Sequence, residues 1–134
     1  MNKIDFVLAW VDGADKEWLA ERRKYNPAKG ADNSAARYRD WENLQYWFRG
    51  VEKFAPWVNR IYFVTCGHIP PWLNTSHPKL KLIRHSDYMN PEYLPTFNIN
   101  SIELNFHRIP ELSEQFVYFN DDMFLLKSVK EEDF

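Results

Sequence analysis

The sequence predicts an α/β domain with a mainly parallel sheet and helices on both faces. Short runs rich in apolar residues alternate along the chain with stretches in which apolar residues recur at helical spacing. Two of the runs are apolar at every position, which is typical of strands buried on both faces of a parallel sheet. A length of 134 residues suits one domain, so we treat residues 1–134 as a single α/β unit.

Four segments are expected to form the strands of this sheet. Residues 6–11 and 116–119 are the two continuously apolar runs, and we expect both to be buried. Residues 60–65 and 80–83 are also expected to be strands, because β-branched, aromatic and other apolar side chains predominate in them. Each of the four is followed by polar or small residues that would end it.

Three helices are expected between these strands. Asp15 is a suitable N-cap for the first helix. The second should open at Asp40 and run to residue 54, because its apolar residues form one stripe and Pro56 follows. Residues 101–109 have a similar stripe and should form the third.

Composition excludes several classes of function. The formal net charge is −2 and no broad basic field is present, so binding to nucleic acid is not expected. A single cysteine, Cys66, rules out a disulfide within the chain. The first residues lack a signal-peptide pattern, and no apolar run approaches the roughly 20 residues that span a bilayer. We therefore expect a cytoplasmic protein whose membrane contact is at most peripheral.

Polar residues follow all four expected strands. In open α/β sheets, ligands bind beyond the carboxyl ends of the strands. If the strands are parallel, these residues meet at one edge of the sheet, which makes that edge the predicted site. The four groups are Asp12-Gly13, Thr65-Cys66-Gly67, His85-Ser86-Asp87 and Asn120-Asp121-Asp122.

The adjacent carboxylates of Asp121 and Asp122 are the sharpest element of this site. Two like charges about 4 Å apart repel by roughly 4 kcal/mol at an effective dielectric constant near 20. A hard cation such as Mg²⁺ or Mn²⁺ reverses that repulsion, takes oxygen ligands and often retains substrate phosphates. The pair is therefore predicted to bind a divalent metal. The alternative is a solvated Asp-Asp turn or a helix cap.

The first strand end offers candidates for contact with a nucleotide. Gly13 would let a ligand approach the backbone closely beside Asp12, although an ordinary turn would have the same residues. Trp10 could stack on a base, or simply pack in the core.

Basic residues elsewhere are candidates for phosphate contact. Arg108 could clamp a phosphate and His107 could exchange protons, unless both lie at an exposed helix end. Arg37 and Arg39 could contact phosphate, or could pair with acidic neighbours before the second helix.

These residues lie within a series of motifs that resembles the Stealth family over nearly the whole chain. The first block comprises Ile4-Asp5-Phe6-Val7 and Trp10-Val11-Asp12-Gly13-Ala14-Asp15. The second block runs from Arg37 to Leu125 and includes Arg39-Asp40, Val51-Glu52-Lys53-Phe54-Ala55-Pro56-Trp57, Ile69-Pro70-Pro71-Trp72-Leu73-Asn74, Tyr93-Leu94-Pro95-Thr96-Phe97-Asn98, His107-Arg108-Ile109-Pro110 and Phe119-Asn120-Asp121-Asp122-Met123-Phe124.

The resemblance implies an activity and a fold. Stealth proteins are bacterial capsular polysaccharide phosphotransferases, related to animal N-acetylglucosamine-1-phosphotransferase. The implied fold resembles nucleotide-sugar transferases of the GT-A type. The implied reaction moves a sugar-1-phosphate from a nucleotide sugar, expected to be a UDP-sugar, to a hydroxyl of a glycan acceptor.

The resemblance also suggests roles for individual residues. Asp121 and Asp122 would hold the metal, and Asn120 would orient them. A second group, which comprises Asn98, Glu103, His107 and Arg108, would face the donor phosphate or sugar.

Some features depart from the family pattern. Ile99 stands where the family usually has Ser. Two further family blocks, which carry a histidine and arginines associated with catalysis, are not reached by Phe134. We therefore expect the front half of a longer transferase, inactive by itself, with an unfinished sheet edge that favours association, as in a homo-oligomer. Ordinary glycosyl transfer, or nucleotide-sugar binding without turnover, are the alternatives.

Overall fold

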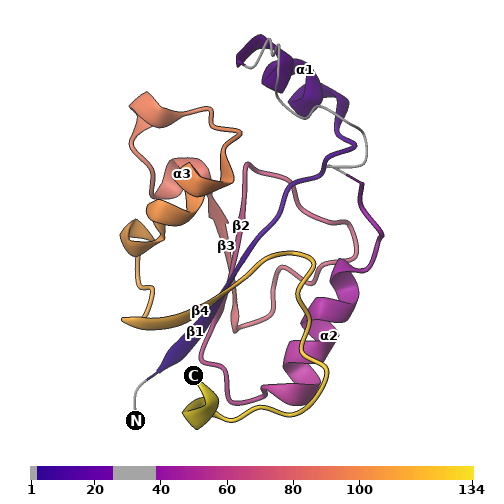
Figure 1. Ribbon diagram of the computed structural model, residues 1–134, viewed down its shortest axis with the longest axis vertical. Helices are drawn as coiled ribbons and strands as arrows, with labels where there is room; N and C mark the ends of the chain where they lie inside the picture. Colours follow the sequence, from indigo (N-terminus) through magenta and orange to yellow (C-terminus); the bar gives the residue numbers. More distant parts are fainter. Residues whose placement is uncertain (1–2, 26–38) are drawn as a thin grey trace.

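The computed structural model describes residues 3–25 and 39–134. Its strands form one four-stranded sheet in the order β3-β2-β1-β4, and every neighbouring pair is parallel (Figure 1). The strands are β1 (Ile4–Ala9), β2 (Ile61–Thr65), β3 (Leu80–Arg84) and β4 (Gln115–Phe119). The helices are α1 (Lys16–Tyr25), α2 (Leu44–Phe54) and α3 (Ile99–Leu104), with short 3-10 helices η2 (His85–Asp87), η3 (Pro91–Tyr93), η4 (Phe106–Arg108) and η5 (Glu131–Asp133).

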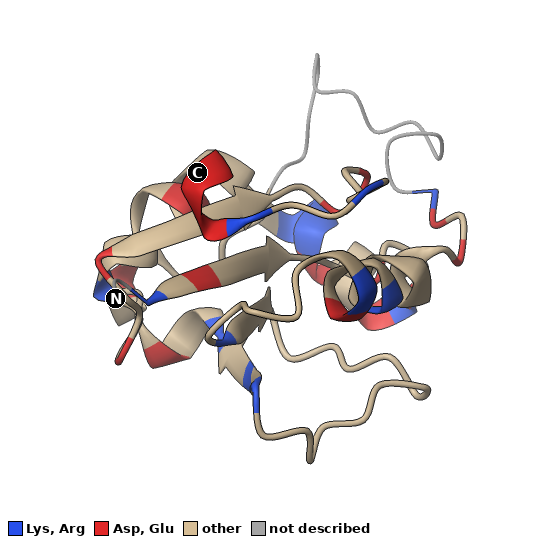
Figure 2. Ribbon diagram, turned by 90° about the horizontal axis from the view of Figure 1, so that it is seen from below, with Lys and Arg blue, Asp and Glu red and all other residues tan. Residues whose placement is uncertain are grey.

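Strand β1 is the centre of the sheet, with a partner on each side. Phe6 pairs with Ile61 of β2 and with Val117 of β4. All six residues of β1 are buried, but the strand begins two residues earlier than the expected run 6–11 and ends before Trp10 and Val11, which are half-buried. Figure 2 shows that the strands have few charged residues and that most Lys, Arg, Asp and Glu lie on helices and loops. This distribution is expected when both faces of a sheet are covered.

Helix α2 covers one face of the sheet. Leu44, Trp47 and Val51 lie on its buried stripe and pack with Phe6 and Leu8 of β1. The opposite face is covered by α3 and η4, from which Ile102, Phe106 and Ile109 pack with β1 and β2. Figure 1 shows α2 and α3 on opposite sides of the sheet. The predicted α/β class, with helices on both faces, is confirmed.

Two helix boundaries differ from those expected. Helix α2 begins at Leu44 and not at Asp40. The Asp40 carboxylate accepts a hydrogen bond from the Glu42 backbone N–H at 2.7 Å, and Glu42 has a φ of 54°. This side-chain turn and left-handed residue prevent the helix from starting earlier. The expected helix over 101–109 is divided into α3 and η4 around Asn105.

The expectation that the fourth strand is fully buried was wrong. Strand β4 lies at the edge of the sheet, and its Phe116 is 37% exposed. Phe119 is buried against Phe6, where the ring centroids are 4.9 Å apart. Among the described residues, no helix is long and apolar enough to cross a membrane.

Candidate functional site

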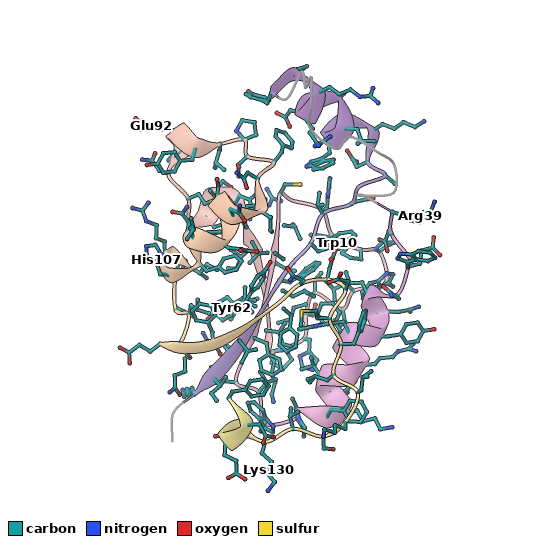
Figure 3. The ribbon with its side chains drawn as sticks, in the orientation of Figure 1. Trp10, Arg39, Tyr62, Glu92, His107 and Lys130 are labelled. Carbon is teal, nitrogen blue, oxygen red and sulfur yellow. The ribbon has the colours of Figure 1, made fainter. Side chains whose placement is uncertain are left out.

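The carboxyl ends of all four strands lie at one edge of the sheet, because every pairing is parallel. A cavity of about 960 Å³ opens there between the turn after β1, the start of α1 and the segments that precede α2 and follow β2. Figure 3 shows Trp10 and Arg39 on separate parts of the chain. The residues that line this cavity include Trp10, Asp12, Gly13, Arg22, Arg23, Arg39, Asp40, His68 and Trp72.

Aromatic and cationic side chains share the walls of this cavity. Trp10 and Trp72 contribute flat apolar surfaces, and Arg22, Arg23 and Arg39 contribute guanidinium groups. Aromatic rings bind planar bases, and arginine binds phosphate with a fork of donors. The same walls carry the carboxylates of Asp12, Asp15, Asp40 and Glu42, so the lining suits a ligand with a ring and negative charge that is accompanied by a cation.

Hydrogen bonds join the loops that follow β1 and β2. The Asp12 backbone N–H donates to Nδ1 of His68 at 3.0 Å, and the Ala14 N–H donates to the Asp12 carboxylate at 3.0 Å. Trp10 meets the His68 ring edge-on, with centroids 6.3 Å apart, and stacks on Phe63 at 5.9 Å. One face of Trp10 is thus used in packing, as the core alternative predicts, while its remaining surface lines the cavity.

Asp121 and Asp122 line a second cavity of about 270 Å³ beside the first. Trp10, Gly13 and Asp40 line both cavities, so the two lie side by side. Both aspartates are exposed to solvent, yet partial burial, and then the charges of Asp122 and Asp40, raise the pKa of Asp121. The acids are therefore crowded by like charge, as the sequence predicts.

The acids fit a metal that arrives with a substrate. In the part of the chain that the structure describes, no three His, Cys, Asp or Glu side chains form a complete metal cage. Mg²⁺ is usually held by one or two carboxylates together with substrate phosphates and water, so a complete cage is not required. The repulsion that raises the pKa of Asp121 would be relieved by a cation between these carboxylates.

A third cavity of about 700 Å³ lies between α1 and the segment that follows η3. Burial lowers the pKa of His85 to about 4 and raises the pKa of the Cys66 thiol, so both side chains are neutral at pH 7. Asp15 and His68 line this cavity as well as the first, which places it at the opposite end of the site from the acid pair.

Other predicted residues lie outside the three cavities. The exposed His107 and Arg108 belong to η4 and line none of them, and Figure 3 shows His107 well apart from Trp10. The Asn98 side chain caps α3 by accepting from the Asn100 N–H at 3.0 Å. Glu103 lies beside the hydroxyl of Tyr118, and Arg37 falls outside the described residues.

The structure adds residues that pattern reasoning did not select. His68 lies one residue beyond the polar group that follows β2, and Trp72 follows a Pro-Pro pair. Arg22 and Arg23 lie on α1, whose own sequence indicates only a capped helix. Tyr118 looks like an ordinary strand aromatic.

Comparison with known proteins decides the family. The model described as Stealth protein CR2, conserved region 2, matches residues 37–134, and that described as Stealth protein CR1, conserved region 1, matches residues 2–30. The chain belongs to the Stealth family. Within this Stealth chain, Trp10 and Gly13 come from the first conserved region, whereas Asp40, Asp121 and Asp122 come from the second. The acid-lined cavity is therefore built by both regions.

Named relatives are phosphotransferases. The chain is 57% identical to capsular polysaccharide phosphotransferase WcwK of Streptococcus pneumoniae, over 99% of this chain and 41% of that protein. It is 54% identical to receptor polysaccharide phosphotransferase WefC of Streptococcus oralis, over 100% of this chain and 42% of that protein. It is 52% identical to capsular polysaccharide phosphotransferase CpsJ of Streptococcus thermophilus, over 98% of this chain and 57% of that protein. The Stealth chain thus spans about half the length of these relatives.

Proposed function

We propose that this Stealth chain binds the donor in a metal-assisted sugar-phosphate transferase of bacterial capsular or cell-surface polysaccharide synthesis. The observation that carries the proposal is that two cavities adjoin and share lining residues. One is lined by two acids after β4, and the other by tryptophans and arginines after β1 and β2. The printed names of the relatives, which are capsular and receptor polysaccharide phosphotransferases, support the same activity.

The reaction transfers a sugar-1-phosphate. An acceptor hydroxyl of the glycan attacks the phosphorus that bears the donor sugar, and forms a new P–O bond. The bond from that phosphorus to the oxygen shared with the nucleotide phosphate breaks, and nucleoside monophosphate leaves. The hydroxyl proton passes to a base, and the product is a phosphodiester between the donor sugar and the glycan.

Different parts of the donor would contact different residues of the two cavities. Trp10 and Trp72 flank the larger cavity, where they would enclose the nucleotide base, and Arg39 lies at the junction with the smaller one, within reach of a phosphate. Gly13, which has no side chain, lines both cavities and leaves the backbone accessible to the ligand.

Asp121 and Asp122 would hold Mg²⁺ or Mn²⁺ against the donor diphosphate. When bound, the metal offsets the charge on the phosphoryl oxygens and on the departing nucleotide phosphate. Asn120 precedes both acids and accepts a hydrogen bond from Tyr118 at 3.0 Å, which fixes the start of the turn that presents them. The parallel β3-β2-β1-β4 sheet, with acids directly after β4, supports the likeness to GT-A transferases.

Identification of the released nucleotide tests the reaction. The full-length protein, incubated with Mn²⁺, a UDP-sugar and its polysaccharide acceptor, should release UMP, because the P–O bond within the diphosphate breaks. Release of UDP would instead indicate ordinary glycosyl transfer, and nucleotide binding without release of either product would indicate a binding module. Chromatographic separation of the two nucleotides distinguishes these outcomes.

Substitution of the acid pair tests the site. Asp122→Asn keeps the size of the side chain and removes its charge, and should lower turnover at least about 100-fold, because several kcal/mol of charge stabilisation are lost. Asp133→Asn removes an exposed aspartate of η5 and serves as the matched control. A turnover of Asp122→Asn within a few-fold of the Asp133→Asn value would contradict the proposed site.

A further inference from the structure

The Tyr118 hydroxyl lies beside two polar side chains, those of Asn120 and Glu103. It donates a hydrogen bond to the Asn120 side-chain oxygen at 3.0 Å. Glu103 of α3 lies beside the same hydroxyl, and after burial its carboxylate contributes to the raised pKa of Tyr118. The single phenolic proton thus faces two acceptors, Asn120 in the turn after β4 and Glu103 in α3. The hydroxyl therefore connects this turn with α3.

The ring of Tyr118 is held independently of its hydroxyl. Its centroid is 5.1 Å from that of Phe106 in an edge-to-face contact, and the ring packs on the cluster that covers the α3 face of the sheet. Tyr118 and Asn120 are two residues apart at the end of β4, so both point to that face. Packing therefore fixes where the hydroxyl is, and the hydroxyl fixes Asn120.

Asn120 begins the turn that carries the two acids. The Met123 backbone N–H donates to the Asn120 carbonyl at 3.1 Å, which makes Asp121 and Asp122 the central residues of a four-residue turn. The residue whose side chain accepts from Tyr118 is thus also the first residue of the turn that presents both carboxylates.

We propose that Tyr118 is a positioning residue whose hydroxyl ties the acid turn, residues 120–122, to Glu103 of α3. This inference rests on the proposed function, because it supposes that the acids bind a metal. Burial, and then the neighbouring carboxylates of Glu103, Asp121 and Asp122, raise the pKa of Tyr118, so the hydroxyl remains a hydrogen-bond donor throughout the neutral range.

The sheet provides a matched control for loss of one hydroxyl. Tyr62 of β2 belongs to the same packed cluster, and its hydroxyl donates to the Glu111 carbonyl at 2.8 Å. Glu111 precedes β4, so this bond lies toward the amino end of that strand, whereas the acids follow its carboxyl end. Tyr62→Phe and Tyr118→Phe therefore each remove one phenolic oxygen from the α3 face of the sheet, near opposite ends of β4.

Mn²⁺ binding to the full-length protein tests the inference without use of turnover. Free Mn²⁺ is measured by electron paramagnetic resonance during titration in the presence of UDP. Tyr118→Phe should weaken Mn²⁺ binding about tenfold, the lower end of the effect of removing a residue that orients metal ligands, because the turn that carries the acids loses its hydrogen bond to the packed face. Tyr62→Phe should remain within twofold of wild type. Steady-state kinetics should show that Tyr118→Phe lowers kcat more than it raises KM for the donor.

A double-mutant cycle shows whether Glu103 acts through this hydroxyl. Glu103→Gln should weaken Mn²⁺ binding clearly in the wild-type background and much less in Tyr118→Phe, because the connecting group is already gone. Additive effects, or equal Mn²⁺ affinities for Tyr118→Phe and Tyr62→Phe, would overturn the inference and leave the proposed function intact. Failure of the wild type to bind Mn²⁺ with UDP would overturn both.

Discussion

The surroundings of individual aspartates distinguish a structural acid from a functional one. Asp5, in the middle of the sheet, is fully buried, and its two oxygens accept from Asn59 at 2.7 Å and from the Ser113 N–H at 2.8 Å. These bonds tie β1 to the segments before β2 and β4. Asp121 instead lies beside Asp122 and Asp40, and partial burial, followed by the charges of these two neighbours, raises its pKa. An arrangement that disfavours the charged form of an acid is common at binding sites.

This crowding predicts that Asp121→Asn stabilises the metal-free protein. A pKa raised in the folded state means that stability is full at low pH and is lost as the pH rises through the folded pKa. At pH 7 in EDTA, Asp121→Asn should therefore unfold at a higher temperature than wild type, and the difference should vanish in acid, where wild-type Asp121 is protonated. Added Mn²⁺ should reverse the order. A lower unfolding temperature for Asp121→Asn in EDTA would refute this account of the pair.

At the scale of elements, the site depends on contacts between the loops that follow neighbouring strands. His68, after β2, accepts the Asp12 N–H that follows β1. Local signals predicted some elements well: Asp15 caps α1 by accepting from the Trp18 N–H at 2.6 Å. Local signals failed where one side chain can stabilise two different backbone structures. Asp40 has the chemistry of a helix cap, yet its carboxylate closes a turn before Leu44.

The loop contact predicts a difference between two substitutions of His68. Asn offers a side-chain oxygen near the position of Nδ1, so His68→Asn should hold UDP within twofold of wild type. His68→Ala loses the acceptor and should bind UDP about threefold to tenfold more weakly, as expected for one hydrogen bond. His77→Ala is the matched control, because His77 accepts the Lys79 N–H at 3.2 Å on the exposed connection before β3. Calorimetric titration gives the UDP affinities. Equal values for His68→Ala and His77→Ala would argue against a role for the Asp12–His68 hydrogen bond in UDP binding.

At the scale of the whole molecule, alternating patterns sufficed to predict the parallel sheet and the edge at which the polar residues meet. The order of the strands was beyond such reasoning, since it depends on which distant segments pair. Phe116 illustrates the consequence: an apolar run indicated burial, but β4 has one neighbouring strand among the described residues and leaves Phe116 partly exposed. The cavity walls were equally hidden, because Arg22 of the first conserved region and Trp72 of the second line one cavity only after both regions fold together.

Metal-dependent binding of UDP to the full-length protein tests the central claim most directly. Calorimetric titrations would compare wild type, Asp122→Asn and the Asp133→Asn control, each in Mn²⁺ and in EDTA. The acid pair predicts that wild type and Asp133→Asn bind UDP at least about tenfold more tightly in Mn²⁺ than in EDTA, and that Asp122→Asn loses this difference. Equal UDP affinity of the wild type in Mn²⁺ and EDTA, or an unchanged metal dependence in Asp122→Asn, would contradict it.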